Sequence, residues 1–510
     1  MENLPVSSSD AWCHSLRRSW KILADTLGMD RTDAVAIVGM TSVALIVGAI
    51  TVATTIDITG DGPSHAILAY SWSKYPEIAT HGNWLPGFTY MAGLCLMVMH
   101  NPLLTPRLYN LCLSTLTIPA FYALVRKLYG SWEALLSTVA LVALPLRIGL
   151  GASSLTEPSF LFFMIAALLC LTAATEHTGV RVIPLSMSVF FFDLAEMTRY
   201  EVWPLIPFAL CYLYARCRRI SVTVFAAAAL SFFPMVWSVG NYLYFGNFLY
   251  PFSRVSHPLE GANPLDIVTA IAYLSDLALS HLGWLLSIAA VAGLARELYR
   301  TMRGRLSAQR AAYAILVVAV WAMIFKGTLA LGPAVYDRYL LFGFTLALPL
   351  ATAAYVEILG RYRHSIAMGV LAIAVSLSVA YWGNRPEVFV TRAMPTDILE
   401  LVRWLPTSPY RKDAVLLTKL NWQSTYFPLY APYMLERYYI VSVWSDDASM
   451  RKFIEEAKPT LLITWIGDGE DRARIVHVLG RSLRLKKPVF VSTGYIEVYD
   501  VSSLIGDRQR

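Results

Sequence analysis

Apolar runs of about 20 residues recur along the first three quarters of the chain, and short polar segments separate them. A transmembrane helix needs about 20 consecutive apolar residues to cross the hydrocarbon core of a bilayer. A further apolar stretch, residues 85–99, is too short for this, and we interpret it as a re-entrant or interface-lying helix. The pattern therefore predicts about eleven transmembrane helices, at residues 34–56, 106–126, 132–152, 158–175, 182–198, 202–216, 221–243, 281–297, 311–331, 339–356 and 365–382.

After Asn384 the pattern changes to short runs of β-branched and aromatic residues, which are typical of strands. The alternation of strand and helix patterns favours a partly parallel sheet. The predicted strands are 414–418, 439–444, 460–465, 489–492 and 495–499, with predicted helices at 396–404, 448–457 and 471–483. The sequence thus predicts a polar tail at 1–33, a polytopic α-helical membrane domain at 34–383 and a small α/β domain at 384–510.

Lysine and arginine residues lie in short clusters between the predicted spans, and cytoplasmic loops are enriched in these residues. With the N-terminal tail in the cytoplasm, the clusters near residues 126, 181, 218, 300 and 362 all fall on the cytoplasmic side. An odd number of spans then places residues 384–510 on the non-cytoplasmic side. The outward loops, 57–105, 153–157, 199–201, 244–280 and 332–338, hold the acidic, histidine and aromatic residues.

Composition agrees with a membrane protein, because 56% of the residues are hydrophobic and only 15% are charged. The first 32 residues lack the apolar core of a cleaved signal peptide. Although the net charge is +7, the basic residues form no continuous face, so we expect no nucleic-acid partner. The six cysteines are scattered without metal-ligand spacing, which argues against a disulfide framework and a zinc site.

The first outward loop contains two carboxylates and a histidine, Asp57, Asp61 and His65, followed by His81 and Trp84. A plain interpretation is a solvated loop in which Asp61 caps a helix and Pro63 lies in its first turn. The same residue types also suit acid–base chemistry at a membrane interface. From the spacing alone, both interpretations stay open.

Charged residues also lie at the ends of predicted spans, where a membrane makes them costly. Glu157, Arg199, Glu201 and Arg338 are such residues, as are Glu196 and Asp337. They either pair with one another and hold helices together, or serve a ligand. Arginine suits phosphate because its guanidinium presents a rigid fork of donors.

The order of several short motifs resembles that of the GT-C membrane glycosyltransferases, especially the protein O-mannosyltransferases and the lipid A aminoarabinose transferases. The resemblance covers about residues 34–382, and its motifs are Gly60-Asp-Gly-Pro-Ser-His65, Trp84-Leu-Pro86, Arg126-Lys-Leu-Tyr-Gly130, Leu155-Thr-Glu-Pro158, Thr198-Arg-Tyr-Glu201 and Asp337-Arg-Tyr339. It implies that Asp61 is the catalytic base and that Arg338 lies on the lipid-phosphate side. Gly62 stands where the family often has a second acid, which leaves Asp57 as a substitute.

The loop from Tyr244 to His257 resembles a further family segment, and its aromatics, Tyr250 included, suit stacking on a sugar or an isoprenoid chain. An aromatic belt at the membrane interface is the alternative, and simpler, explanation. His81 and His257 lack spaced partner ligands, so we expect neither to bind a metal. A divalent metal is compatible with the chemistry but not indicated, and no cofactor is implied.

We therefore expect a glycosyltransferase that moves a sugar from a polyprenyl-phosphate donor to a hydroxyl of a protein, lipid or glycan on the non-cytoplasmic face. A multi-pass transporter or flippase and a non-catalytic scaffold subunit are the alternatives. Repeated halves would favour a transporter, and none are visible. The chain has no Asn-X-Ser/Thr acceptor, which favours a prokaryotic plasma membrane over the endoplasmic reticulum.

Overall fold

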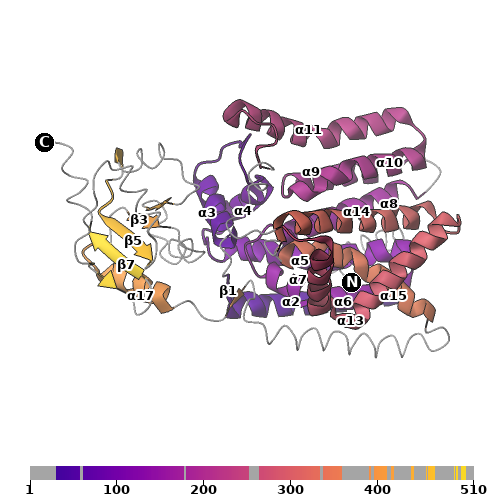
Figure 1. The fold of residues 1–510 in the computed structure, drawn as a ribbon, viewed down its shortest axis with the longest axis horizontal. Helices are drawn as coiled ribbons and strands as arrows, with labels where there is room; N and C mark the ends of the chain where they lie inside the picture. Colours follow the sequence, from indigo (N-terminus) through magenta and orange to yellow (C-terminus); the bar gives the residue numbers. More distant parts are fainter. Residues whose placement is uncertain are drawn as a thin grey trace, which may run out of the picture.

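The computed structural model describes residues 30–57, 61–176, 180–251, 264–332, 337–358, 390–391, 396–410, 415–418, 438–441, 455–456, 458–465, 488, 490–491 and 496–500. Figure 1 shows a bundle of long helices with a sheet at one end. The bundle consists of α2 (Arg31–Thr54), α5 (Thr105–Leu128), α6 (Ser131–Ala143), α7 (Pro145–Gly151), α8 (Glu157–Ala174), α9 (Val182–Glu196), α10 (Ile206–Cys217), α11 (Ile220–Phe245), α13 (Ile267–Met302), α14 (Ala308–Leu331) and α15 (Leu341–Ile358).

Seven helices of the described residues are long and apolar enough to cross a membrane, or eight if α6 and α7 form one bent span. The helices α9 and α10 occupy two further predicted spans but are only 15 and 12 residues long. The last predicted span, 365–382, lies outside the described residues. The number of about eleven spans therefore stays a prediction, while the mainly helical architecture is confirmed.

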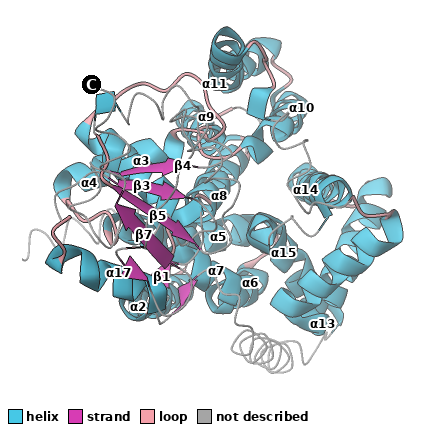
Figure 2. Ribbon diagram, turned by 60° about the vertical axis from the view of Figure 1, so that its left-hand side comes forward, coloured by secondary structure: helices cyan, strands magenta, loops and turns pink. Residues whose placement is uncertain are grey.

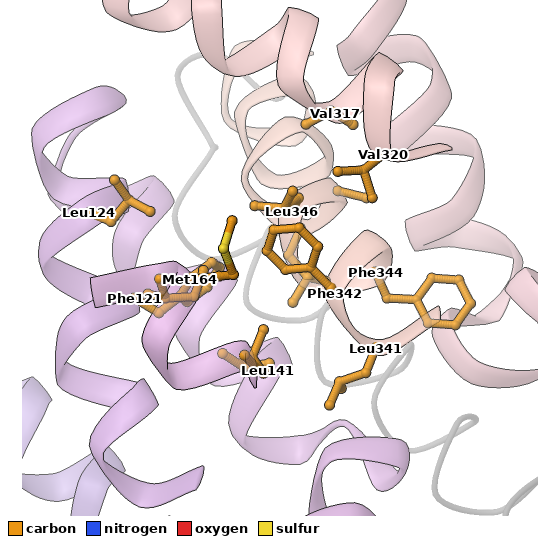
Figure 3. Close-up of a cluster of buried hydrophobic side chains, with 14 of the residues drawn as sticks. Phe121, Leu124, Leu141, Met164, Val317, Val320, Leu341, Phe342, Phe344 and Leu346 are labelled. Atoms are coloured by element: carbon orange, nitrogen blue, oxygen red, sulfur yellow. The ribbon is translucent and has the colours of Figure 1, made fainter. Parts of the chain in front are cut away.

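The helix α15 lies at the centre of the bundle, and 89% of the residues in its apolar stretch are buried. For α11, at the edge, the share is 17%. Figure 3 shows part of this core, with Phe121 and Leu141 packed near Met164, Phe342 and Leu346. In a bilayer such helices associate mainly through close packing, since lipid tails are as apolar as leucine. The central packing holds rigid the two elements that carry Glu157 and Arg338.

Two helices are broken at positions that the hydrophobic pattern did not reveal. The predicted span 132–152 is bent by 58° between α6 and α7, because Pro145 starts a new helix. In α13 the backbone leaves the helical conformation at Gly283, with φ 76° and ψ 159°. The predicted span 281–297 corresponds to the part of α13 after this break. The part before it is helical, where the sequence predicted an outward loop over 244–280.

Two short helices, α3 (Asp61–Lys74) and α4 (Gly87–Val98), cover one end of the bundle (Figure 1). The 12 residues of α4 rise about 18 Å, well below the roughly 30 Å of a hydrocarbon core. The predicted short helix is thus present, and it does not span. Its start is fixed on the end of α9, because Gly87 N–H donates to the Met197 carbonyl at 2.7 Å. A Cβ at Gly87 would collide with that carbonyl.

The C-terminal residues form a five-stranded sheet in the order β4-β3-β5-β7-β6. Its strands are β3 (Val415–Thr418), β4 (Tyr438–Val441), β5 (Leu461–Trp465), β6 (Phe490–Val491) and β7 (Ile496–Asp500). The first three are parallel, and β7 pairs antiparallel with β5 and β6. Each strand lies within a predicted strand or one residue beyond it, and α17 (Thr396–Trp404) coincides with a predicted helix. Apart from Glu455 and Glu456, the predicted helices 448–457 and 471–483 lie outside the described residues.

The sheet lies at the end of the bundle that α3 and α4 occupy, as Figures 1 and 2 show from two directions. A short antiparallel pair joins the two parts, since β1 (Ile56–Asp57) pairs with β2 (Val390–Thr391). The end of α2, the first loop and the start of the C-terminal region therefore meet at one place. The short turns η1 (Tyr200–Leu205), η3 (Asp337–Leu340) and η5 (Leu405–Thr407) complete the described elements.

Candidate functional site

Five charged side chains from distant segments form one continuous chain of ion pairs at the end of the bundle beneath α3. Asp61 pairs with Arg338, and Arg338 Nε lies 3.4 Å from Glu157 Oε1. The same Glu157 oxygen lies 2.6 Å from Arg199 Nη1, and Arg199 Nη2 lies 2.5 Å from Glu201 Oε1. Four of the motifs that the sequence singled out therefore meet in space. This network is the candidate site.

Local structure explains why the acids lie where they do. Asp61 is the first residue of α3, and Glu157 is the first residue of α8. The N-terminus of a helix carries partial positive charge and unpaired N–H groups, so a carboxylate there is stabilised. Pro63 and Pro158 follow within the first turns, where proline is tolerated because its missing N–H would have no partner.

The guanidinium of Arg199 is nearly saturated by protein groups. Its Nε and Nη2 atoms both donate to Glu201, and its Nη1 donates to Glu157 and, at 3.1 Å, to Thr156 Oγ1. Burial alone would lower the pKa of Arg199, but the two carboxylates outweigh burial and raise that pKa above its ordinary value. This arrangement agrees with the first of the two roles expected from the sequence, in which the charged residues pair with one another and hold helices together.

Arg338 pairs with an exposed carboxylate, as Arg199 does with Glu201. Its own side chain is only 8% exposed, whereas the carboxylate of Asp61 is 42% exposed. The ring of Tyr339 contacts both guanidiniums, and its centroid lies 4.9 Å from the guanidinium of Arg199 and 5.1 Å from that of Arg338. Cation–π contacts of this kind hold guanidiniums in place. The network thus has two exposed ends, Asp61 beside Arg338 and Glu201, which is 43% exposed, beside Arg199.

Glu157 lies in the middle of the network and is buried. Its Oε1 serves both arginines, while Oε2 is buried without a hydrogen-bond partner among the described residues. An unsatisfied buried oxygen is costly, so this part of the network has an acceptor that its protein neighbours leave unused.

His65 lies one turn along α3 from Asp61 and is buried against aromatic rings. Its ring centroid is 4.5 Å from Trp84 and 5.6 Å from Phe88. Burial lowers the pKa of His65 to about 4. At neutral pH the imidazole is therefore uncharged, and Trp84 covers it from the first loop.

Asp57, the second candidate base, occupies a different setting. It lies in β1, is buried, and its Oδ2 accepts a hydrogen bond from the Ser154 backbone N–H at 2.7 Å. The carboxylate thus links the end of α2 to the loop before α8. The ion pairs that the described residues form in the network involve the carboxylates of Asp61, Glu157 and Glu201.

The aromatic candidates form a separate cluster beside the network. His81 stacks on Tyr244 at 3.9 Å, and Tyr250 stacks on Phe245 at 3.7 Å. A hydrogen bond of 3.1 Å from the Tyr200 hydroxyl to the Asn83 carbonyl connects this cluster to η1. His257 lies outside the described residues.

Sequence reasoning missed His281 as a site residue. This buried histidine of α13 lies two residues before the break at Gly283, and its Nε2 lies 2.7 Å from Asp337 Oδ2. Asp337 opens the turn that carries Arg338. The only sequence signal was a polar residue at the predicted start of an apolar span. Among the described residues, no group of three or more histidine, cysteine, aspartate or glutamate side chains is arranged to hold a metal ion.

Residues 81–240 match the sequence model of a family described as dolichyl-phosphate-mannose-protein mannosyltransferase. No curated protein sequence matches the chain. Among solved structures, ArnT from Cupriavidus metallidurans superposes in the apo state with a TM-score of 0.63 and 13% identity over 92% of this chain and 98% of that chain. The chain has the GT-C fold.

Two further structures share this GT-C architecture. The same ArnT bound to undecaprenyl phosphate gives a TM-score of 0.62, with 13% identity over 92% of this chain and 98% of that chain. The oligosaccharyltransferase AglB from Archaeoglobus fulgidus, in complex with an inhibitory peptide and a dolichol-phosphate, gives 0.59, with 10% identity over 86% of this chain and 69% of that chain. The resemblance found in the short motifs is confirmed, and the GT-C chain is an integral membrane protein.

Proposed function

We propose that the chain is a glycosyltransferase that moves a sugar from a polyprenyl-phosphate donor to a hydroxyl acceptor on the non-cytoplasmic face of the membrane. The observation that carries the proposal is the pair of Asp61, an accessible carboxylate, and Arg338, a phosphate-binding type of side chain, at one end of the bundle. Base and phosphate ligand are the two groups that this reaction needs. The fold shared with ArnT and AglB, whose structures hold undecaprenyl phosphate and dolichol-phosphate, supports the donor class.

In the proposed reaction Asp61 takes the proton of the acceptor hydroxyl. The hydroxyl oxygen bonds to the anomeric carbon of the sugar as the bond from that carbon to the phosphate oxygen breaks. The phosphate leaves on the lipid with the electron pair of that bond, so its negative charge grows in the transition state. The guanidinium of Arg338 stabilises this charge. Arg199 and Glu201 hold Glu157, and Glu157 orients Arg338.

The remaining residues surround this centre. Asp57 keeps the first loop closed against the start of α8, and His65 with Trp84 forms its apolar wall. The aromatic cluster with His81 and Tyr250 supplies ring faces for the acceptor or the isoprenoid chain. We place the sheet of residues 384–510 outside the cytoplasm, because it lies at the end of the bundle that carries Asp61 (Figure 1).

The test compares the purified wild type with Asp61→Asn in detergent. Radiolabelled polyprenyl-phosphate sugars serve as donors, a membrane extract serves as acceptor, and release of label from the lipid is measured. Removal of a general base typically costs about 10²–10⁴-fold in rate, so we expect Asp61→Asn to lose at least 100-fold. Asp57→Asn is the matched control, because it removes the neighbouring carboxylate that lies outside the network.

Equal losses in the two variants would contradict the role of Asp61. An absence of turnover with every donor, in a folded wild type, would overturn the transferase assignment. It would favour the transporter or the scaffold, for which many spans and ion pairs between helices are equally natural.

A further inference from the structure

In the arrangement that the structure shows, the network carries more negative than positive charges, which opposes the binding of a phosphate. The five members carry three carboxylates, Asp61, Glu157 and Glu201, and two guanidiniums. A polyprenyl-phosphate sugar is a phosphodiester and brings one more negative charge. Like charges brought together at short range repel strongly when they are partly buried. A phosphate that binds here must therefore take a guanidinium from one of the carboxylates.

The three carboxylates differ in how firmly they are held. Glu157 is buried between both arginines, and removal of one partner from a buried pair is strongly unfavourable. Glu201 receives two donors from Arg199, from Nε at 3.0 Å and Nη2 at 2.5 Å. Asp61 accepts from Arg338 Nη2, and its carboxylate is 42% exposed. Water can replace the guanidinium at such a carboxylate with little loss.

The position of Arg338 points to the same carboxylate. Its side chain is only 8% exposed, and Glu157 and Tyr339 cover its inner parts. Its Nη2 atom donates to Asp61 and, at 3.3 Å, to the Tyr339 hydroxyl. Of the two carboxylates that the structure pairs with Arg338, Asp61 is the exposed one and Glu157 the buried one.

We propose that the donor's phosphate displaces Asp61 from Arg338, so that one arginine holds the base in the empty site and the phosphate in the loaded site. The inference rests on the proposed function and adds the order of events. Paired with a guanidinium, the ionised carboxylate of Asp61 is stabilised and is a poor proton acceptor. Once the phosphate takes the guanidinium, Asp61 lies beside a negative charge and accepts a proton more readily. Donor binding therefore activates the base, and the acceptor reacts second.

Substitution of an ordinary active-site residue weakens binding of the substrate. This exchange predicts the opposite for Asp61. If Asp61 competes with phosphate for Arg338, its removal strengthens lipid-phosphate binding while it abolishes transfer. An exposed ion pair contributes up to about 1 kcal/mol, which corresponds to about a fivefold change in affinity. We expect Asp61→Asn to bind a polyprenyl monophosphate about three- to fivefold more tightly than the wild type does.

The experiment measures binding of polyprenyl monophosphate in detergent to the wild type, Asp61→Asn and Asp61→Ser by microscale thermophoresis. Both substitutions keep a residue that caps a helix N-terminus, and thermal unfolding verifies that each variant is folded. Glu201→Gln is the matched control, since its carboxylate is 43% exposed, nearly the same as that of Asp61, and the net charge changes equally. Inorganic phosphate and phosphatidylglycerol micelles in separate arms distinguish a polyprenyl phosphate site from a general anion site.

Tighter binding in the two Asp61 variants, with a smaller change in Glu201→Gln, supports the exchange. Tighter binding by the same factor in all three variants indicates a general charge effect and overturns it. Unchanged or weaker binding in the Asp61 variants, with a wild type that binds, overturns the exchange but leaves the proposed function standing. No binding of the lipid phosphate to any of the proteins overturns both.

Discussion

At the scale of single residues, the meaning of each charge depends on a neighbour that the sequence does not show. Asp57 and Asp61 are four positions apart in one loop, yet Asp57 accepts a backbone hydrogen bond and Asp61 meets Arg338. Arg199 and Arg338 each precede a tyrosine, yet Arg199 pairs with Glu201 two residues along the chain and Arg338 pairs with Asp61 from the first loop. Residues from four of the motifs meet in one network of ion pairs. The proposed division of these residues into a clamp and reacting groups depends on the distances.

His65 gives a pH prediction that belongs to this scale. In the folded protein the pKa of His65 is about 4, compared with 6.5 ordinarily. Between these pH values, therefore, His65 binds a proton only in the unfolded chain. The contribution of His65 to the free energy of unfolding is therefore fully present above pH 6.5, and it is lost as the pH is lowered towards 4. A shift of this size corresponds to about 3 kcal/mol at most.

We expect the melting temperature of the wild type in detergent to drop between pH 6.5 and 4, and that of His65→Gln to drop less over the same interval. His100→Gln is the control, because His100 is exposed and lies at the far end of α4. If all three proteins lost the same number of degrees, burial of an uncharged His65 would be wrong.

At the scale of elements, the hydrophobic pattern located helices well but not their breaks. A run of apolar residues looks the same whether the helix is straight or bent, so the bend at Pro145 and the break at Gly283 appeared only in the structure. The five strands were located because short β-branched runs between polar turns have few other interpretations. Their order, with β3 between β4 and β5, depends on pairings between distant segments and was not predicted.

The break in α13 matters for the site, because it follows His281, which contacts Asp337 beside Arg338. The conformation of Gly283, φ 76° and ψ 159°, is accessible almost only to glycine. We expect Gly283→Ala to lower the free energy of unfolding by about 1–3 kcal/mol and to weaken binding of polyprenyl monophosphate.

Gly327→Ala is the matched control, since Gly327 lies inside α14 and a Cβ there meets nothing within 4 Å. Alanine within a helix is more stable than glycine by about 0.5–1 kcal/mol, so this variant should melt no lower than the wild type. Thermal unfolding in detergent and binding of polyprenyl monophosphate are measured for both variants. A Gly283→Ala protein that matched Gly327→Ala in both would show that the break is unimportant for η3.

At the scale of the whole molecule, the network, the short helices α3 and α4 and the C-terminal sheet lie at one end of the bundle (Figure 1). The distribution of basic residues assigned this end to the outside. This orientation depends on the number of spans, and one span more or fewer inverts the side of every segment that follows. The pairing of β1 with β2 ties the C-terminal region to the first loop without any counting. It is therefore enough to determine on which side of the membrane this one end of the molecule lies.

Cysteine labelling answers that question. In a variant with its six native cysteines replaced by alanine, we expect Glu77→Cys and Thr407→Cys to react with a membrane-impermeant maleimide in intact cells. Both positions are exposed, one in the first loop and one beside the C-terminal sheet. Arg305→Cys, in the exposed turn between α13 and α14, should react only after permeabilisation.

The pattern of the three positions separates the possible errors. If Arg305→Cys alone reacted in intact cells, the whole orientation would be inverted and the proposed site would face the cytoplasm. If Thr407→Cys behaved like Arg305→Cys while Glu77→Cys reacted, the sheet would lie apart from the first loop, against the β1–β2 pairing. Only labelling of both outer positions agrees with a base, a lipid phosphate and an acceptor that meet beneath the sheet on the non-cytoplasmic face.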